Sequence, residues 1–342
     1  MNSRRLYQTA SAAALIALLG SAFAPVAAVQ AYHFAVLVCL QPALGCLFLI
    51  LLHQSTGGKW GQRIMPALLA GSRLIPWCVL ALVPVLIFLP SVYHWAGNPQ
   101  TLGDRARFLN WPFFSLRVGI YLMVFGGLAH SVGRGRKPAA GGLIAFALIG
   151  YFLAIDLVMA IDPDWYSSGF PVVFMAGQGL MALAMAVTLC AGQTAGTADK
   201  EQRAIWRDSG NLLLAMVVFW SYVAFTQFLI IWTGNLPREI QWYVQRGSGV
   251  WRWVTVFLAV FNLFAPFFVL LSRAIKDDPE RLRWVAAAIL SCQVVYLYWL
   301  VAPSLPGHPP ERLWLDAVML VAVAAPFAGK LITIYQRIEC HE

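Results

Sequence analysis

Two charged residues inside apolar runs are the first candidates for chemistry in this chain. Arg117 ends the stretch NWPFFSLR (110–117), and Asp156 lies in YFLAIDLVMAIDPDWYSS (151–168). Ionisable side chains at membrane depth cost free energy and usually serve a function. A buried carboxylate can relay protons, whereas one that is neutralised by an arginine or a hydrogen bond from a neighbouring helix holds helices together. Both interpretations of Asp156 stay open, and Arg117 is its expected charge partner.

Hydroxyl and amide side chains in segment 210–233 form a second candidate group. Its members are Ser221, Tyr222, Thr226 and Gln227. Tyr222 and Thr226 are one helical turn apart and therefore share a face. Such groups relay protons through hydroxyls and water, or they join helices through interhelical hydrogen bonds. The sequence alone allows either role.

Cysteines and histidines do not form a pattern that binds a metal or a haem. The six cysteines include no CxxC pair and no CxxCH, so zinc, iron–sulfur and covalent haem ligation have no support. The six histidines lie mostly at the ends of apolar runs or in loops, whereas a haem held between helices needs axial ligands at matching depth. We therefore expect no metal and no redox cofactor bound by this chain.

The composition is that of a membrane protein. Of 342 residues, 60% are hydrophobic and 11% are charged, whereas a soluble globular chain carries about 25% charged residues. The net charge of +9 is spread over short basic clusters between apolar runs, which is the positive-inside pattern rather than a stripe that binds phosphate. The chain is therefore expected to lie in a lipid bilayer and to bind no nucleic acid.

Ten segments are long and apolar enough to cross a bilayer as helices, each with about 20 residues. They are 9–28, 32–53, 74–94, 112–131, 139–161, 169–191, 210–233, 249–272, 283–303 and 312–334. The longest connections are 54–73 and 192–209, so no soluble domain is expected. With the N-terminus inside, most of the 24 Lys and Arg residues fall on the inner side, and both termini are expected in the cytoplasm.

The first segment has two interpretations. Arg4 and Arg5 precede SAAALIALLGSAFAPVAA (11–28), which resembles a secretory signal that is cleaved. Because a second apolar segment begins at residue 32, a tight hairpin of two retained helices fits better.

A weak repeat suggests how the spans are arranged. HWAGNP (94–99) follows the third segment, and IWTGNLP (231–237) follows the seventh. An even shift of four helices preserves topology, so we expect two parallel four-helix bundles, 32–161 and 169–303, with 9–28 and 312–334 as peripheral spans. Tryptophan anchors at a membrane interface explain part of this similarity without a duplication.

Four motifs resemble the F subunit of alternative complex III, a bacterial quinol:cytochrome c oxidoreductase. They are NWPFFSLR (110–117), AIDPDWYSS (160–168), FWSYVAFTQFLIIWTGNLPREIQWYVQR (219–246) and FAPFFVLLSRAIK (264–276). That subunit is related to the membrane subunit of polysulfide reductase and is built from about ten spans in two four-helix bundles. The resemblance covers residues 90–280 by motif and the remainder by topology.

The resemblance implies a membrane subunit without a redox centre of its own, in the bacterial inner membrane. Its partners would be a sister membrane subunit, an iron–sulfur protein and a multihaem cytochrome c, which hold the clusters and the c haems. The chain would contribute a scaffold and a proton path or a quinone contact, with Asp156 as the leading residue. Asp156 matches the acidic position of the family's Asp-Trp pair, but Leu157 replaces the Trp.

Two other functions remain open. A purely structural membrane subunit would need no proton path. A secondary transporter or permease would show paired broken helices near the midplane, and Pro42 and Pro84 do lie near the middle of segments two and three, although segments six and seven have no matching proline. The polar hinge at 234–239 is expected at the outer surface, where it would dock cytochrome subunits.

Overall fold

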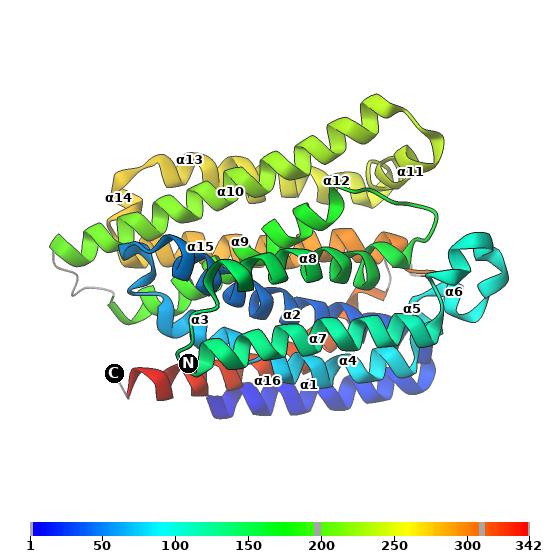
Figure 1. Ribbon diagram of the computed structural model, residues 1–342, viewed down its shortest axis with the longest axis horizontal. Helices are drawn as coiled ribbons and strands as arrows, with labels where there is room; N and C mark the ends of the chain where they lie inside the picture. Colours follow the sequence, from blue (N-terminus) through cyan, green and yellow to red (C-terminus); the bar gives the residue numbers. More distant parts are fainter. Residues whose placement is uncertain (1–2, 195–199, 308–311, 341–342) are drawn as a thin grey trace.

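The computed structural model describes residues 3–194, 200–307 and 312–340, which form helices and turns with no strand among them. In this described part, ten helical stretches are long and apolar enough to cross a membrane. The predicted class, an all-α integral membrane protein with about ten spans, is confirmed. Figure 1 shows the long helices lying side by side along the longest axis of the molecule.

In the described residues, twelve helices make up the spans, and four further helices lie at the ends of the spans. The helices that make up the spans are α1 (Ser3–Phe23), α2 (Pro25–Thr56), α3 (Met65–Ser72), α4 (Ile75–Ile87), α7 (Trp111–Gly133), α8 (Ala139–Leu157), α9 (Phe170–Thr194), α10 (Lys200–Gly234), α12 (Gly249–Leu258), α13 (Ala265–Leu271), α15 (Pro279–Val301) and α16 (Leu313–Glu339). The short helices are α5 (Leu89–Val92), α6 (His94–Gly97), α11 (Pro237–Arg246) and α14 (Arg273–Lys276).

Helices α2 and α9 form the centre of the molecule and pack against each other. Both are apolar all round, as a helix surrounded by other helices must be. A Cβ atom added at Gly45 would lie 1.9 Å from the backbone oxygen of Gln178. Only glycine therefore allows these two backbones to approach so closely.

The other helices pack around this central pair in two groups. Helices α4, α7 and α8 lie on the α2 side, and α10, α12, α13 and α15 lie on the α9 side. Helices α1 and α16 pack on each other along one edge, and the start of α1 lies at the same end of the molecule as the end of α16 (Figure 1). That the two groups are repeats stays a prediction.

The repeat motifs themselves differ in their surroundings. Trp95 of the first motif is 1% exposed, whereas Trp232 of the second is 50% exposed. After the first motif the chain enters a 3-10 helix (Pro99–Arg107, η2), and after the second it enters α11. The similar sequences therefore end helices in both places but build different local structures.

The first and third predicted spans extend too far, because they end at Phe23 and Ile87 rather than at 28 and 94. The starts of three predicted spans are also wrong, each for a physical reason. The third span begins at Met65 rather than 74, because the short apolar helix α3 lies in the predicted 54–73 connection and buries Leu68. Helix α10 begins at Lys200, within the predicted 192–209 connection, and there buries Trp206. Helix α2 begins directly after Ala24, since a proline at the first helical position needs no hydrogen-bond partner.

The predicted span 249–272 contains a π-helical turn, Ala259–Phe264 (η4), between α12 and α13. Pro266 follows this turn and has no N–H to continue an α-helical ladder. Asn262 in the turn is fully buried, and its Oδ1 accepts a hydrogen bond from Gln293 Nε2 at 3.3 Å. Single π turns inside α-helices occur often at functional sites.

Candidate functional site

Arg117 and Asp156 meet in the structure as a buried ion pair between α7 and α8. Arg117 Nε lies 2.8 Å from Asp156 Oδ2, and Arg117 Nη2 lies 2.8 Å from Asp156 Oδ1. Tyr121 donates its hydroxyl to Asp156 Oδ2 at 3.0 Å. Asp156 is fully buried and Arg117 is 7% exposed. The predicted pairing of these two residues is thus present in the structure.

This geometry favours a charged, immobile carboxylate. Two parallel N–H···O bonds from one guanidinium give the strongest form of carboxylate contact, and the third donor, from Tyr121, satisfies a further lone pair. The Phe108 carbonyl accepts from Arg117 Nη1 at 2.7 Å and fixes the arginine as well. These donors occupy three of the roughly four lone-pair positions of the carboxylate, so little of it remains open to a proton.

The end of α8 beside Asp156 is held by residues that the sequence did not single out. The Leu157 carbonyl accepts from Tyr93 OH at 2.9 Å and lies 3.2 Å from His33 Nε2. Trp95 Nε1 donates to the Ala160 carbonyl at 2.8 Å. Carbonyls at a helix end have no partner within the helix, so these side chains complete the hydrogen bonding of α8 and of the 3-10 turn Met159–Ile161 that follows it. In the sequence, the run Tyr93-His94-Trp95 before the first Gly-Asn-Pro could have indicated the contacts of Tyr93 and Trp95, but nothing indicated that of His33.

The second candidate group divides between two environments. Ser221 and Gln227 are buried and line a cavity, whereas Tyr222 is 65% exposed on the outside of α10 and Thr226 is half-buried and does not line the cavity. Helix α10 is apolar on both faces here, so the sequence carried no signal for which face would be covered.

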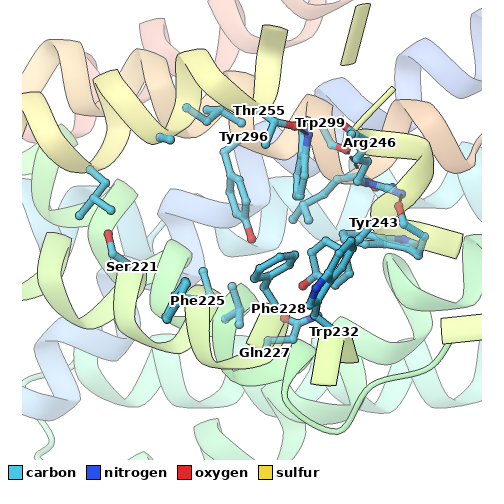
Figure 2. Close-up of a pocket in the computed structure, with 18 of the residues that line it drawn as sticks. Ser221, Phe225, Gln227, Phe228, Trp232, Tyr243, Arg246, Thr255, Tyr296 and Trp299 are labelled. Carbon is cyan, nitrogen blue, oxygen red and sulfur yellow. Dashed lines mark hydrogen bonds between the residues drawn. The ribbon is translucent and has the colours of Figure 1, made fainter. Parts of the chain in front are cut away.

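The cavity lies between α10, α11, α12 and α15 and has a volume of about 790 Å³ (Figure 2). Its wall is largely aromatic and includes Phe225, Phe228, Trp232, Trp242, Tyr243, Tyr296 and Trp299. Ser221 and Tyr296 point into the shared space from helices on opposite sides (Figure 2). Phe225 and Trp232 are also exposed on the outside of the bundle, so the cavity opens sideways between the helices.

Arg246 closes the end of the cavity on which α11 lies. It is 1% exposed and donates to the Trp299 and Trp242 carbonyls at 3.1 Å, to the Leu300 carbonyl at 2.7 Å and to Ser304 Oγ at 3.0 Å. Its guanidinium lies 3.4 Å from the centre of the Trp242 ring. The arginine therefore attaches α11 to the carboxyl end of α15, where a cation also interacts favourably with the helix dipole.

Burial of this cation has an electrostatic cost. Burial lowers the pKa of Arg246 to about 9, and the nearby Asp162, Tyr243 and Tyr296 partly offset this effect because each of them raises the pKa. Burial in turn raises the pKa of Asp162 above its usual value. The sequence placed Arg246 in an outer loop, and only the i, i+4 spacing of Trp242 and Arg246 could have indicated a packed pair.

The hinge before α11 explains how that helix reaches the cavity. Asn235 has a φ of +47°, in the left-handed region that asparagine tolerates better than most residues. The reversal ends α10, and Pro237 begins α11. Trp242 then stacks on Trp165 with ring centres 4.3 Å apart. The polar hinge is thus a turn that folds α11 over the cavity.

A smaller hollow of about 450 Å³ lies on the other side of Trp242. Asp162, Asp164, Arg238 and Gln241 contribute to its wall. Within the described residues, no three His, Cys, Asp or Glu side chains lie close enough together to hold a metal ion.

Together the fold and the cavity define a polytopic α-helical membrane protein with an aromatic-rich cavity between helices. A scan against family models and a search of curated proteins match nothing for this chain.

Proposed function

We propose that this protein is a membrane subunit of a bacterial quinol:cytochrome c oxidoreductase, and that its cavity contacts the quinol or quinone. The observation that carries this proposal is the aromatic cavity of about 790 Å³ with hydrogen-bonding groups at both ends. Binding cavities for small molecules are typically apolar concavities of this size with a few placed polar groups. A quinone ring with an isoprenoid tail has the matching chemistry.

The lining residues suggest how such a ring would lie. Ser221 and Tyr296 offer hydroxyls from opposite sides of the cavity, Gln227 offers an amide, and Arg246 closes the α11 end (Figure 2). The exposed Phe225 and Trp232 leave a lateral opening through which an apolar tail would extend into lipid. In this proposal, the chain holds no redox centre of its own, and the electrons of the quinol pass to haem c or iron–sulfur clusters of partner subunits.

The Arg117–Asp156 pair would serve as scaffold. Its bidentate geometry supports a role in holding α7 against α8, and a proton relay through Asp156 stays the alternative. Both termini would be cytoplasmic, which places α11 on the outer side, near cytochrome subunits.

Purification from membranes tests the assignment. An affinity tag on the chain is expected to retrieve a multihaem cytochrome, an iron–sulfur protein and a second polytopic subunit, with quinol:cytochrome c activity. Retrieval of a lone chain that carries out substrate uptake would overturn the proposal in favour of a transporter.

Photolabelling tests the cavity. A quinone that carries a photoreactive group is expected to label α10 and α15, and Ser221→Ala with Gln227→Ala should weaken the labelling about tenfold, as expected for two lost hydrogen bonds. Tyr222→Phe is the matched control, because Tyr222 lies on the outside of the same helix. Equal labelling in all three proteins would refute the cavity assignment.

A further inference from the structure

The charged side chains that line the cavity are all of one sign. Among its lining residues are two arginines, Arg246 and Arg252, and no aspartate or glutamate. Arg252 is exposed and donates from Nε to the Gly247 carbonyl at 3.1 Å. An apolar cavity has a low dielectric constant, so two cations at its wall act strongly on any charge that develops inside it.

Arg246 is hydrogen-bonded but not neutralised by its direct contacts. A guanidinium has five N–H groups, and four of them point to the uncharged oxygens of Trp242, Trp299, Leu300 and Ser304. The fifth N–H, on Nη1, takes no part in these four contacts. The cation therefore sits at the cavity wall without a carboxylate in hydrogen-bond contact.

The other ionisable groups that face Arg246 come from the elements around it. Asp162 after α8 interacts with it through space, as do Tyr243 of α11 and Tyr296 of α15. Asp162 lines the neighbouring hollow rather than the cavity, and Trp242 belongs to both walls. The balance of charge that a ligand would meet is consequently positive.

From this balance we infer that the cavity binds quinol as the singly deprotonated quinolate anion, stabilised by Arg246 and Arg252. This inference rests on the proposed function. One quinol O–H bond breaks, its proton passes to water at the α11 end, and the electron pair stays on the oxygen. Two one-electron acceptors, which are oxidised c haems or iron–sulfur clusters of partner subunits, would then take one electron each, and the second hydroxyl would release its proton.

A pair of probes separates anion binding from ring binding. 2-Hydroxy-1,4-naphthoquinone forms a coloured anion, whereas 2-methoxy-1,4-naphthoquinone has nearly the same shape and cannot ionise. The full-length chain, with any subunits that co-purify, is placed in phosphatidylcholine nanodiscs. Absorbance titration gives the apparent pKa of the bound hydroxyl, and displacement of a labelled quinone gives the affinity of both probes.

The bound hydroxyl is expected to ionise about one pH unit lower than in empty nanodiscs, which corresponds to about tenfold tighter binding of the anion. Arg252→Gln should reduce this shift, because one of the two lining cations is lost, and should leave the binding of the methoxy probe unaffected. Arg238→Gln is the matched control, because Arg238 is exposed on α11 and lines only the neighbouring hollow. Arg246→Lys keeps the charge and should keep part of the shift if α11 stays folded.

The outcomes distinguish the two proposals. If the methoxy probe binds in the cavity and the hydroxyl shows no shift, the anion inference fails while the quinone proposal stands. If neither probe displaces the labelled quinone, both fail. If phosphatidylglycerol in the nanodiscs displaces both probes and abolishes the shift, the arginines serve a lipid phosphate and the anion inference is overturned.

Discussion

Replacing Asp156 with asparagine separates a structural ion pair from a proton relay. The substitution keeps the shape of the side chain but removes the charge that Arg117 meets in bidentate geometry. Because both residues are buried, Arg117 would keep an uncompensated charge. Removing one partner of a buried ion pair costs about 3–5 kcal/mol.

The expected loss can be measured as thermal stability. A loss of about 3 kcal/mol corresponds to roughly 6–12 °C in the midpoint of unfolding, at about 2–4 °C per kcal/mol for a domain of 150–250 residues. Fluorescence-detected size-exclusion chromatography of the heated, solubilised protein gives this midpoint. Tyr121→Phe removes a single hydrogen bond to the carboxylate and should cost about 1.5 kcal/mol, the lower end for a bond to a charged group.

A double-mutant cycle tests whether the effect belongs to the pair. Arg117→Gln combined with Asp156→Asn should lose less stability than the two single changes added together, with a coupling energy near the upper end of about 0.5–3 kcal/mol. The reasoning is refuted if Asp156→Asn leaves the unfolding midpoint unchanged but abolishes proton release during quinol oxidation. That result would assign Asp156 to a relay.

Three further predictions address other parts of the molecule. Gly45→Ala should lower the unfolding midpoint or abolish monodisperse protein, because its Cβ would lie 1.9 Å from a backbone oxygen, whereas Gly119→Ala, with nothing within 4 Å, should be tolerated. Arg246→Met should release α11 from α15 and make 237–246 sensitive to protease, because buried carbonyls lose their donors. Unchanged resistance to protease would show that Arg246 does not hold α11 in place. Arg207 lowers the pKa of Asp277 below its usual 3.8, so the stabilisation from this pair is complete above that pH and is lost as the pH falls through the lowered value. Hydrogen exchange at the start of α10 should therefore rise in acid, and Asp277→Asn should exchange rapidly at every pH.

The ten spans and one ion pair could be predicted from the sequence, because both follow from the free-energy cost of placing polar groups in lipid. Ten apolar runs had to be helices, and a carboxylate and a guanidinium in neighbouring spans had to meet or be neutralised in another way. Arg117 and Asp156 do meet. Helix α3 escaped prediction because Arg63 and Arg73 flank an apolar stretch of only eight residues.

The cavity could not be predicted, because it depends on how α10 is rotated. Ser221 and Gln227 face inward while Tyr222 faces outward, and the choice is made by the helices that cover each face. Nor does any local pattern show that the arginine ending α11 would reach the carboxyl end of α15. Both features arise from contacts between segments that are far apart in the chain.

The segment 225–246 joins these observations. Its sequence suggested a polar hinge that docks partners at the surface, yet in the structure its two helical parts line one cavity: Phe225 and Trp232 come from α10, and Trp242 and Arg246 come from α11. The left-handed Asn235 makes this possible by turning the chain back over the bundle. In contrast to the network around Asp156, this site has an open side and a cation whose hydrogen-bond partners are all uncharged. In the proposed function, a quinol would therefore bind in the cavity beneath α11, and the Arg117–Asp156 ion pair would stabilise the packing of α7 against α8.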